Sequence, residues 1–390
     1  MSADLAAPRA TPRAPAAAAL GLAAAAALLA FGFLRAESQA AVGWIAAIAV
    51  AAVLAAARLG ALRWASRGAL ENERATGAAL ALGLALLVLA FHDDHFTLLL
   101  LARVLLVGMA CLGLHVQLGM GGVVNFAGAA FFGVGSYTAA VLAARTPIPH
   151  LAVLAAGGAA AALVGSVLLL PLLRTRGHYA ALVTIAFGIG FRTFLEVNDA
   201  LGGPQGLNVR GFSLLGLSFN ESWSVGGFEL SFYVAYVALG FLLLGCAFAA
   251  VRRLETSWVG LALDAVRLDE TAAAAFGVRA PRWKIGAFTL GNFITGVAGA
   301  LSAMMTGYIA PNAFTFQESL VFVSIVLLGG IGNAWGLVLA SFIVVVVPEK
   351  LQAIQEYRFL LFAALVVLVL VFRPSGLVPR ALRRGFGGAA

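Results

Sequence analysis

Charged residues are scarce in this chain, and that scarcity decides its class. Only 11% of the 390 residues are charged and 62% are hydrophobic, whereas about a quarter of the residues in a soluble domain are charged. A water-soluble fold is excluded, because so much apolar sequence could not be hidden from water. Since one bilayer crossing takes about 20 apolar residues, we predict an all-α integral membrane protein, a polytopic helical bundle of about 10–12 spans.

Further absences narrow the function. Cys111 and Cys246 are the only cysteines and both lie in apolar runs, which excludes a disulfide framework and a cysteine metal site. Lys284 and Lys350 are the only lysines, and neither has the flanking residues of a Walker A loop, so any ATPase must be another polypeptide. No carboxylate lies near the middle of an apolar run, which disfavours a proton- or sodium-coupled carrier. We predict no cofactor, and no acid, base and metal-ligand constellation indicates an enzyme.

Apolar runs predict the helices. They cover residues 16–34, 41–57, 75–91, 96–114, 123–142, 151–173, 179–195, 228–251, 285–305, 320–329, 338–347 and 359–372. The first run follows two arginines as a cleaved signal peptide would, but its length and the run directly after it favour a first span. Runs 320–329 and 338–347 are short for a hydrocarbon core of about 30 Å. Because the segment between them is rich in glycine, they are either two tilted spans or a re-entrant pair of half-helices.

The basic residues predict the orientation. They gather in segments 58–74, 174–176, 252–284 and 373–384, and all of these fall on one side when both termini are cytoplasmic. The segments on the opposite side are 92–95, 198–227 and 308–318, which we predict to be periplasmic. The net charge of +8 therefore reflects the topology of the chain, with basic loops that lie close to membrane lipid. It does not predict a surface for nucleic acid, because the arginines do not line one polar face.

A cluster of glycines and polar residues occupies residues 117–138. One interpretation is close helix packing through small residues, which membrane helices use because lipid gives them no hydrophobic drive to associate. The other is a broken helix that exposes backbone dipoles and amides to a passing solute. The sequence leaves both open.

The long basic loop 252–284 contains a second cluster. Asp269 is placed to cap a short helix whose first turn holds Glu270, and Gly277 is placed to end it in a left-handed conformation. Such an alanine-rich helix can present a compact knob to a groove on a partner. The alternative is a surface helix lying on anionic lipid, because three basic residues follow at once.

The tetrapeptide His92-Asp93-Asp94-His95 has the composition of a metal site. Two histidines and two aspartates in a short connecting loop are more often solvated. We predict no metal site here.

Several motifs in their shared order resemble one family. They are LHVQLG at 114–119, NFAGAAFFGVGSY at 125–137, HYAALVT at 178–184, GGPQGL at 202–207, DETAAAAFG at 269–277, GYIAP at 307–311 and FRPSGL at 372–377. Together they resemble the membrane permeases of branched-chain amino-acid importers of the ATP-binding-cassette class, with the related urea and amide permeases. The resemblance covers about residues 105–379. It leaves residues 1–100 as extra amino-terminal helices with an arginine-rich cytoplasmic loop, 101–379 as the permease core, and 380–390 as a basic cytoplasmic tail.

The resemblance implies a function and partners. The function is a permease subunit that moves branched-chain or other small amino acids across a bacterial inner membrane. The alternatives are urea, a short amide or another small organic solute and, in a different class, a passive channel. The implied partners are a second homologous permease subunit, two cytoplasmic ATPase subunits and a periplasmic solute-binding protein.

The resemblance also suggests site residues. The coupling motif that docks on the ATPase corresponds to Asp269, Glu270, Ala272, Ala273 and Gly277. The polar groups that we expect along the translocation path are Gln117, Asn125, Tyr137, Thr184 and Asn292. Asn125 departs from the family pattern, because relatives often carry a small hydroxyl residue in this segment. That difference puts the identity of the solute in doubt.

Overall fold

The structure is a computed structural model that describes most of the chain between residues 13 and 350. The described residues are 13–36, 38, 41–45, 48, 68, 72–173, 178–214, 217–221, 223–225 and 228–350, with Tyr357, Leu360, Ala364, Val367 and Gly376. Most of the predicted helices 41–57 and 359–372 lie outside these residues. The same holds for the arginines of segments 58–67, 174–176 and 373–384, and for the tail 380–390.

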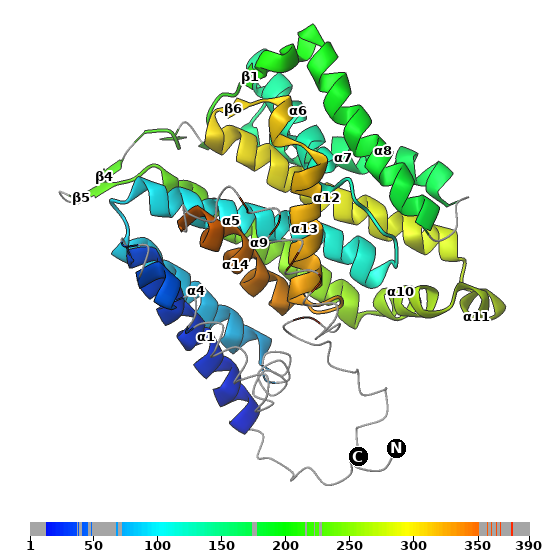
Figure 1. The fold of residues 1–390 in the computed structure, drawn as a ribbon, viewed down its shortest axis with the longest axis horizontal. Helices are drawn as coiled ribbons and strands as arrows, with labels where there is room; N and C mark the ends of the chain where they lie inside the picture. The colour runs from blue at the N-terminus through cyan, green and yellow to red at the C-terminus, as the bar shows by residue number, and fades with distance from the viewer. Residues whose placement is uncertain are drawn as a thin grey trace.

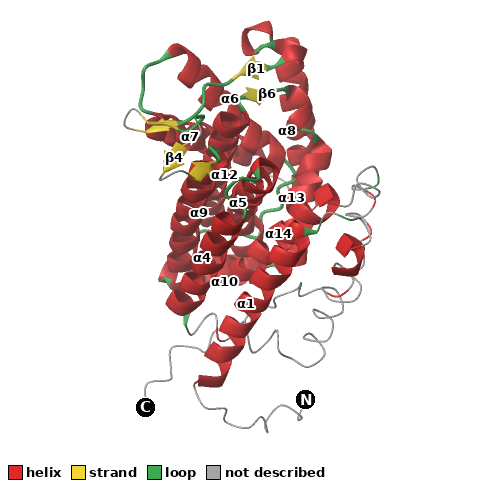
Figure 2. Ribbon diagram, turned by 90° about the vertical axis from the view of Figure 1, so that its left-hand side faces the viewer, coloured by secondary structure: helices red, strands yellow, loops and turns green. Residues whose placement is uncertain are grey.

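Long helices joined by short connections make up the described part of the chain (Figures 1 and 2). The long helices are α1 (Arg13–Arg35), α4 (Glu73–Ala90), α5 (His95–His115), α6 (Gly128–Arg145), α7 (His150–Leu172), α8 (His178–Val197), α9 (Tyr233–Thr256), α10 (Trp258–Leu268), α12 (Ala280–Thr306), α13 (Phe316–Gly329) and α14 (Ala334–Lys350). The short ones are the π-helix η1 (Val116–Met120), the 3₁₀ turns η2 (Asp199–Leu201), η3 (Gly203–Gln205) and η4 (Pro311–Ala313), and α11 (Glu270–Ala275).

Six helices within the described residues are long and apolar enough to cross a membrane. These segments are His95–Met120, His150–Pro171, Tyr179–Val197, Tyr233–Thr256, Ala280–Thr306 and Pro311–Gly329. The prediction of an all-α polytopic membrane protein is therefore confirmed. The total of about 10–12 spans stays a prediction, because it counts runs that the structure does not describe in full.

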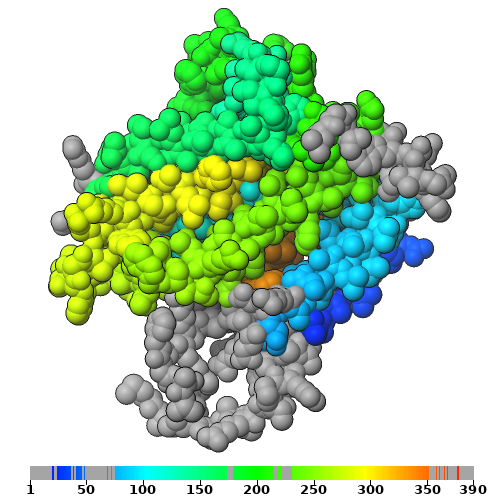
Figure 3. Space-filling view, turned by 180° about the vertical axis from the view of Figure 1, so that it is seen from behind, coloured from blue at the N-terminus to red at the C-terminus, as the bar shows by residue number. Residues whose placement is uncertain are grey.

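Helix α12 is the centre of the bundle. It packs against α5, α6 and α7, and from behind it crosses the molecule between α7 and α9 (Figure 3). Helix α5 is the most enclosed of the candidate spans, with 83% of its apolar window buried, whereas α8 has 17% buried and lies at the periphery. The polar site described below therefore sits where α5 and α12 meet.

Short strands gather at one end of the bundle (Figure 2). They are β1 (Leu207–Asn208), β2 (Ser213–Leu214), β3 (Leu217–Ser218), β4 (Trp223–Val225), β5 (Phe228–Leu230) and β6 (Tyr308–Ile309), in the antiparallel pairs β1–β6, β2–β3 and β4–β5. In the first pair Leu207 lies opposite Ile309, and the N–H of Ser231 donates to the carbonyl of His92 at 3.2 Å. The strand pair joins segments 198–227 and 308–318, and the Ser231 bond places segment 92–95 beside the start of α9, just after segment 198–227.

Some helix limits differ from the apolar runs. The run at 228–251 begins as strand β5, and α9 starts only at Tyr233. The run at 320–329 understates α13, which begins at Phe316 after the Thr315 hydroxyl accepts a hydrogen bond from the N–H of Glu318. Hydropathy misses such a polar first turn. With η4 before it, this helix is long enough to span, and a four-residue turn leads to α14.

Candidate functional site

The helical conformation is interrupted between α5 and α6, at the glycine cluster. Helix α5 passes into the π-helix η1, the chain is not helical from Gly121 to Ala127, and α6 begins at Gly128. A π-helix frees backbone groups from the regular ladder and is frequent at functional sites. The N–H of Val123 donates to the carbonyl of Gln117 at 2.9 Å, which closes the turn. The predicted broken helix is therefore present, and part of the predicted run 123–142 is not helical.

Close packing through small residues is present as well. A Cβ atom on Gly113 would lie 2.3 Å from the carbonyl oxygen of Gly291, so α5 and α12 touch through their backbones. A Cβ atom on Gly299 would lie 2.0 Å from the carbonyl oxygen of Phe132 on α6. Real Cβ atoms do not approach so closely, so these positions require glycine. Within the cluster itself, a Cβ atom on Gly135 would lie 2.0 Å from the carbonyl oxygen of Gly296. Close packing and a break in the helix are both present, and the exposure of the break to a passing solute stays a prediction.

Three side-chain amides form a buried chain at the break. Gln117 donates through Nε2 to Asn292 Oδ1 at 2.8 Å and accepts at Oε1 from Asn125 Nδ2 at 2.7 Å. Asn125 Oδ1 in turn accepts the N–H of Ala127 at 2.8 Å, which holds the non-helical segment in place. Their exposed fractions are 0%, 3% and 1% for Gln117, Asn125 and Asn292. This chain joins η1 and the adjacent break to α12, although Gln117 and Asn292 lie 175 positions apart in sequence.

Thr184 reaches the same place from α8. Its hydroxyl accepts the N–H of Phe126 at 3.1 Å and donates to the carbonyl of Ala181 at 2.8 Å. Since Phe126 follows Asn125 directly, the break is fixed from two sides. The structure thus brings together four of the five predicted path residues.

Tyr137 does not join them. It lies on α6 at 5.8 Å, ring to ring, from Phe314, and its buried hydroxyl has no hydrogen-bond partner among the described residues. Its helical position places it more than two turns beyond the start of α6. Its place on the translocation path stays a prediction.

One donor of the amide chain is left over. Asn292 Nδ2 is buried and has no hydrogen-bond partner among the described residues. It points at Gly165 on α7, where a Cβ atom would lie 2.1 Å from that nitrogen. The amide nitrogen is therefore held against the backbone of α7, and an unpaired buried donor of this kind is costly.

The predicted capped knob has the expected geometry. The Asp269 carboxylate accepts the N–H groups of Thr271 and Ala272 at 2.8 and 3.0 Å, and α11 follows from Glu270 to Ala275. Gly277 has φ +80° and a Cβ atom there would touch nothing within 4 Å. The helix ends because of this backbone conformation and not because of crowding.

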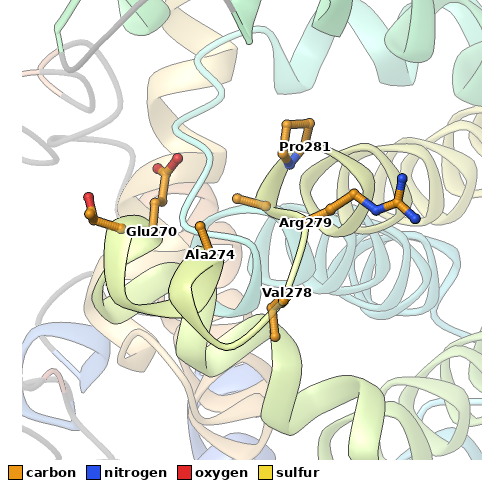
Figure 4. A pocket seen from close by; sticks show the side chains of 8 residues that line it. Glu270, Ala274, Val278, Arg279 and Pro281 are labelled. Carbon is orange, nitrogen blue, oxygen red and sulfur yellow. The ribbon is translucent and has the colours of Figure 1, made fainter.

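The capped knob, helix α11, is held by a small apolar cluster, and most of its surface is exposed. Ala273 packs with Val266 and Ala280, whereas Ala272 is exposed and the Phe276 side chain is 89% exposed. An open pocket of about 520 Å³ lies between α11 and the start of α12, lined by Glu270, Thr271, Ala274, Gly277, Val278, Arg279, Ala280 and Pro281 (Figure 4). Lys284 forms an ion pair with Glu270 across this turn.

A buried charged cluster was missed from the sequence. His115 Nε2 lies 3.2 Å from Glu255 Oε1, and Arg252 binds the other carboxylate oxygen. The side chains of His115 and Glu255 are 0% and 7% exposed. His115 and Glu255 stand at the ends of apolar runs and 140 positions apart, so neither looked like a mid-span charge. The only signal in the sequence was that the ends of the two apolar runs are predicted to lie on the same, cytoplasmic side of the membrane.

The four residues 92–95 serve local structure. Asp94 caps α5 by accepting the N–H groups of Phe96 and Thr97, and His95 Nδ1 lies 2.6 Å from the Ser231 hydroxyl. His92 pairs with Asp93 at 3.1 Å. No group of three or more His, Cys, Asp or Glu side chains in the described ranges is arranged to hold a metal ion.

These features define a class: a polytopic α-helical membrane protein with a broken helix and amide network in its core and a capped helical knob at one end. Residues 96–370 match the sequence profile of the family described as branched-chain amino acid transport system / permease component, and the chain belongs to this family.

Relatives carry names of the same kind. The high-affinity branched-chain amino acid transport system permease protein LivM of Salmonella typhimurium is 34% identical over 69% of this chain and 66% of its own length. The probable branched-chain amino acid transport permease protein LivM of Methanocaldococcus jannaschii is 27% identical over 55% of this chain and 64% of its own. The permease protein LivH of Salmonella typhimurium is 24% identical over 70% of this chain and 91% of its own length. The chain thus spans just under two thirds of the length of the LivM relatives, and no solved structure matches it.

Proposed function

We propose that this chain is a permease subunit of an ATP-driven importer that moves branched-chain or other small amino acids across a bacterial inner membrane. It works with a second homologous permease subunit, two cytoplasmic ATPase subunits and a periplasmic solute-binding protein. Family membership supports the permease role, and the printed names of the LivM and LivH relatives support the solute class. Similarity to both LivM and LivH supports a pairing of two related permeases.

The observation that carries the proposal is the amide chain at the broken helix. Gln117, Asn125 and Asn292 offer neutral donors and acceptors in an interior that would disfavour a multiply charged solute. Broken helix ends add backbone dipoles, which transporters use to bind zwitterions near the bilayer midplane. The unpaired Asn292 Nδ2 supplies a donor suited to a carboxylate or an amide oxygen.

A purely structural role is the competing explanation. Polar contacts between membrane helices contribute about 0.6 kcal/mol each on average, and two of the three amide bonds described above join one element to another. A structural role predicts lower stability without a selective loss of transport. Measuring both the stability and the transport activity of the variants therefore distinguishes the two explanations.

The capped knob supports the coupling role. Asp269 fixes the first turn of α11, and Gly277 turns the chain back toward α12. Phe276 at the end of α11 is 89% exposed, and Leu268 at the end of α10, just before α11, is 78% exposed. Exposed apolar side chains on a short rigid helix would be buried in a groove on an ATPase. Such burial favours binding, since buried aromatic anchors dominate protein interfaces.

The test is uptake by vesicles that contain the full complex. Asn125→Leu and Asn292→Leu should each lower ATP-dependent uptake of a branched-chain amino acid at least tenfold, with assembly and basal ATP hydrolysis retained. Ser136→Ala is the matched control, because it removes a buried bond from Ser136 Oγ to the Gly299 carbonyl elsewhere on α12. Unchanged uptake in both leucine variants removes them from the path.

The same vesicles discriminate between the solute classes. Robust uptake of a multiply charged solute would refute the substrate class, and uptake of urea or a short amide in place of amino acids would assign the alternative. Uptake that does not require ATP would indicate a passive channel.

A further inference from the structure

Two contacts flank helix α10, one just before its start and one at its far end. Before its start, Glu255 in the last turn of α9 lies two residues ahead of the Ser257 cap and bonds His115, the last residue of α5. At its far end, Arg267 packs on Gly122, where a Cβ atom would lie 3.1 Å from Arg267 Cγ and 3.4 Å from its Cα. Gly122 has φ +64°, so a side chain there would be strained as well as crowded.

The first attachment is buried. His115 and Glu255 are almost fully enclosed, and Arg252 binds the second oxygen of Glu255. Separating His115 from Glu255 would leave two buried polar atoms without this hydrogen bond, which is unfavourable. We therefore expect the contact to hold when the neighbouring helices move.

The attached segment carries the amide chain. Gln117 follows His115 by two residues, and Asn125 follows Gly122 by three. Between them the N–H of Gly121 donates to the carbonyl of Val116 at 3.0 Å, and the N–H of Val123 donates to that of Gln117 at 2.9 Å. A displacement at either attachment is thus passed on through a hydrogen-bonded turn.

We propose that α10 and α11 act as a lever that moves Gln117 and Asn125 through two attachments, Glu255–His115 and Arg267–Gly122. The inference rests on the proposed function only for the source of the movement, an ATPase that pushes α11. His115 and Glu255 are positioning residues in this scheme. They set where the amide chain stands and do not touch the solute.

The attachment itself is tested without transport. Hydrogen exchange is measured on the detergent-solubilised full-length chain and on its His115→Ala, Glu255→Ala, His115→Gln and Ser136→Ala variants. Backbone amides of α10 should exchange at least tenfold faster in the two alanine variants at positions 115 and 255. They should stay within about threefold of wild type in His115→Gln, whose side-chain N–H can still donate to Glu255, and in Ser136→Ala.

The same experiment includes its own reference. Amides of α7, which packs mainly on α12 and α6, should change less than twofold in every variant. Unchanged exchange in α10 would overturn the proposal. Equal acceleration in α7 and α10 would also overturn it, because the cluster would then stabilise the whole bundle and not position the lever.

Transport supplies the second test. In the assembled complex, His115→Ala and Glu255→Ala should lower ATP-driven uptake at least tenfold, while ATP hydrolysis without solute stays within twofold of wild type. His115→Gln should keep at least half of the uptake. Full uptake in both alanine variants would overturn the lever whatever the exchange shows. A wild-type complex without uptake would refute the proposed function, and the exchange result would still decide the attachment.

Discussion

The backbones of α6 and α12 meet at Gly135 and Gly296. A Cβ atom on Gly135 would lie 2.0 Å from the carbonyl oxygen of Gly296 and 2.7 Å from its Cα. Helix α7 joins the same contact, because a Cβ atom on Gly296 would lie 2.8 Å from the carbonyl oxygen of Gly157. Three helices therefore cross at backbone distance, as small residues allow in membranes.

We expect Gly135→Ala to destabilise the protein by about 1–3 kcal/mol, because forcing an extra methyl group into a filled contact shifts the backbone. Gly190→Ala is the matched control, since α8 leaves open space around Gly190. In that exposed helical position alanine should be neutral or stabilise by about 0.5–1 kcal/mol. Thermal unfolding in detergent measures both. Equal melting temperatures for the two variants would contradict the close crossing.

Hydropathy predicted most of the helices because a bilayer span needs a long apolar run. It failed where polar groups begin or break a helix. Thr315 caps α13 ahead of its apolar run, and the first residues of the run 123–142, up to Ala127, are not helical. In both cases hydrogen bonds decided the local structure, and a hydropathy average does not contain them.

The site was predictable in part for the same reason. Gln117 and Asn125 are conspicuous as amides within apolar sequence, and Asp269 and Gly277 carry a local capping signal. The pair of His115 with Glu255 was not, because its meaning depends on a contact between α5 and α9. Tyr137 was expected on the same path as the amides, and its position on α6 separates it from their hydrogen-bonded chain.

The orientation can be tested by cysteine labelling. Cys111 and Cys246 are first replaced by serine, because Cys246 is exposed on α9. A cysteine at Gln205 should then be blocked in intact cells by an impermeant thiol reagent, and a cysteine at Arg279 should not, since both native side chains are exposed at opposite ends of the bundle. Labelling at position 279 with protection at 205 would reverse the topology.

Asp94 should make the start of α5 sensitive to acid. Burial acts to raise the pKa of its carboxyl group, but hydrogen bonds from the Thr97 hydroxyl and from the N–H groups of Thr97 and Phe96, with the charge of Lys350, lower it overall. A lowered folded-state pKa stabilises the protein above the unfolded value of about 3.9, and this contribution is lost as pH falls through the folded-state pKa.

Asp94→Ala should therefore lower the free energy of unfolding by about 1 kcal/mol at neutral pH, as the loss of an N-cap does. The difference from wild type should shrink below pH of about 3.9. Asp93→Ala is the control, because Asp93 is 70% exposed and pairs only with the neighbouring His92 in the described structure. Melting temperatures across pH measure both variants. A difference that persists at low pH would show that Asp94 acts without its charge.

Gly277 tests the coupling role of α11 without crowding any neighbour. Its φ of +80° is unfavourable for a side chain, and a Cβ atom there would meet nothing within 4 Å, so Gly277→Val should act through backbone strain of about 1–2 kcal/mol. Gly286→Val is the control, because Gly286 is helical and equally uncrowded. We expect Gly277→Val to weaken ATPase association and uptake at least fivefold. Gly277→Asn should lie between Gly277→Val and wild type, because asparagine tolerates the left-handed region. Gly286→Val should match wild type. Full ATPase association and uptake in Gly277→Val would remove α11 from the coupling route.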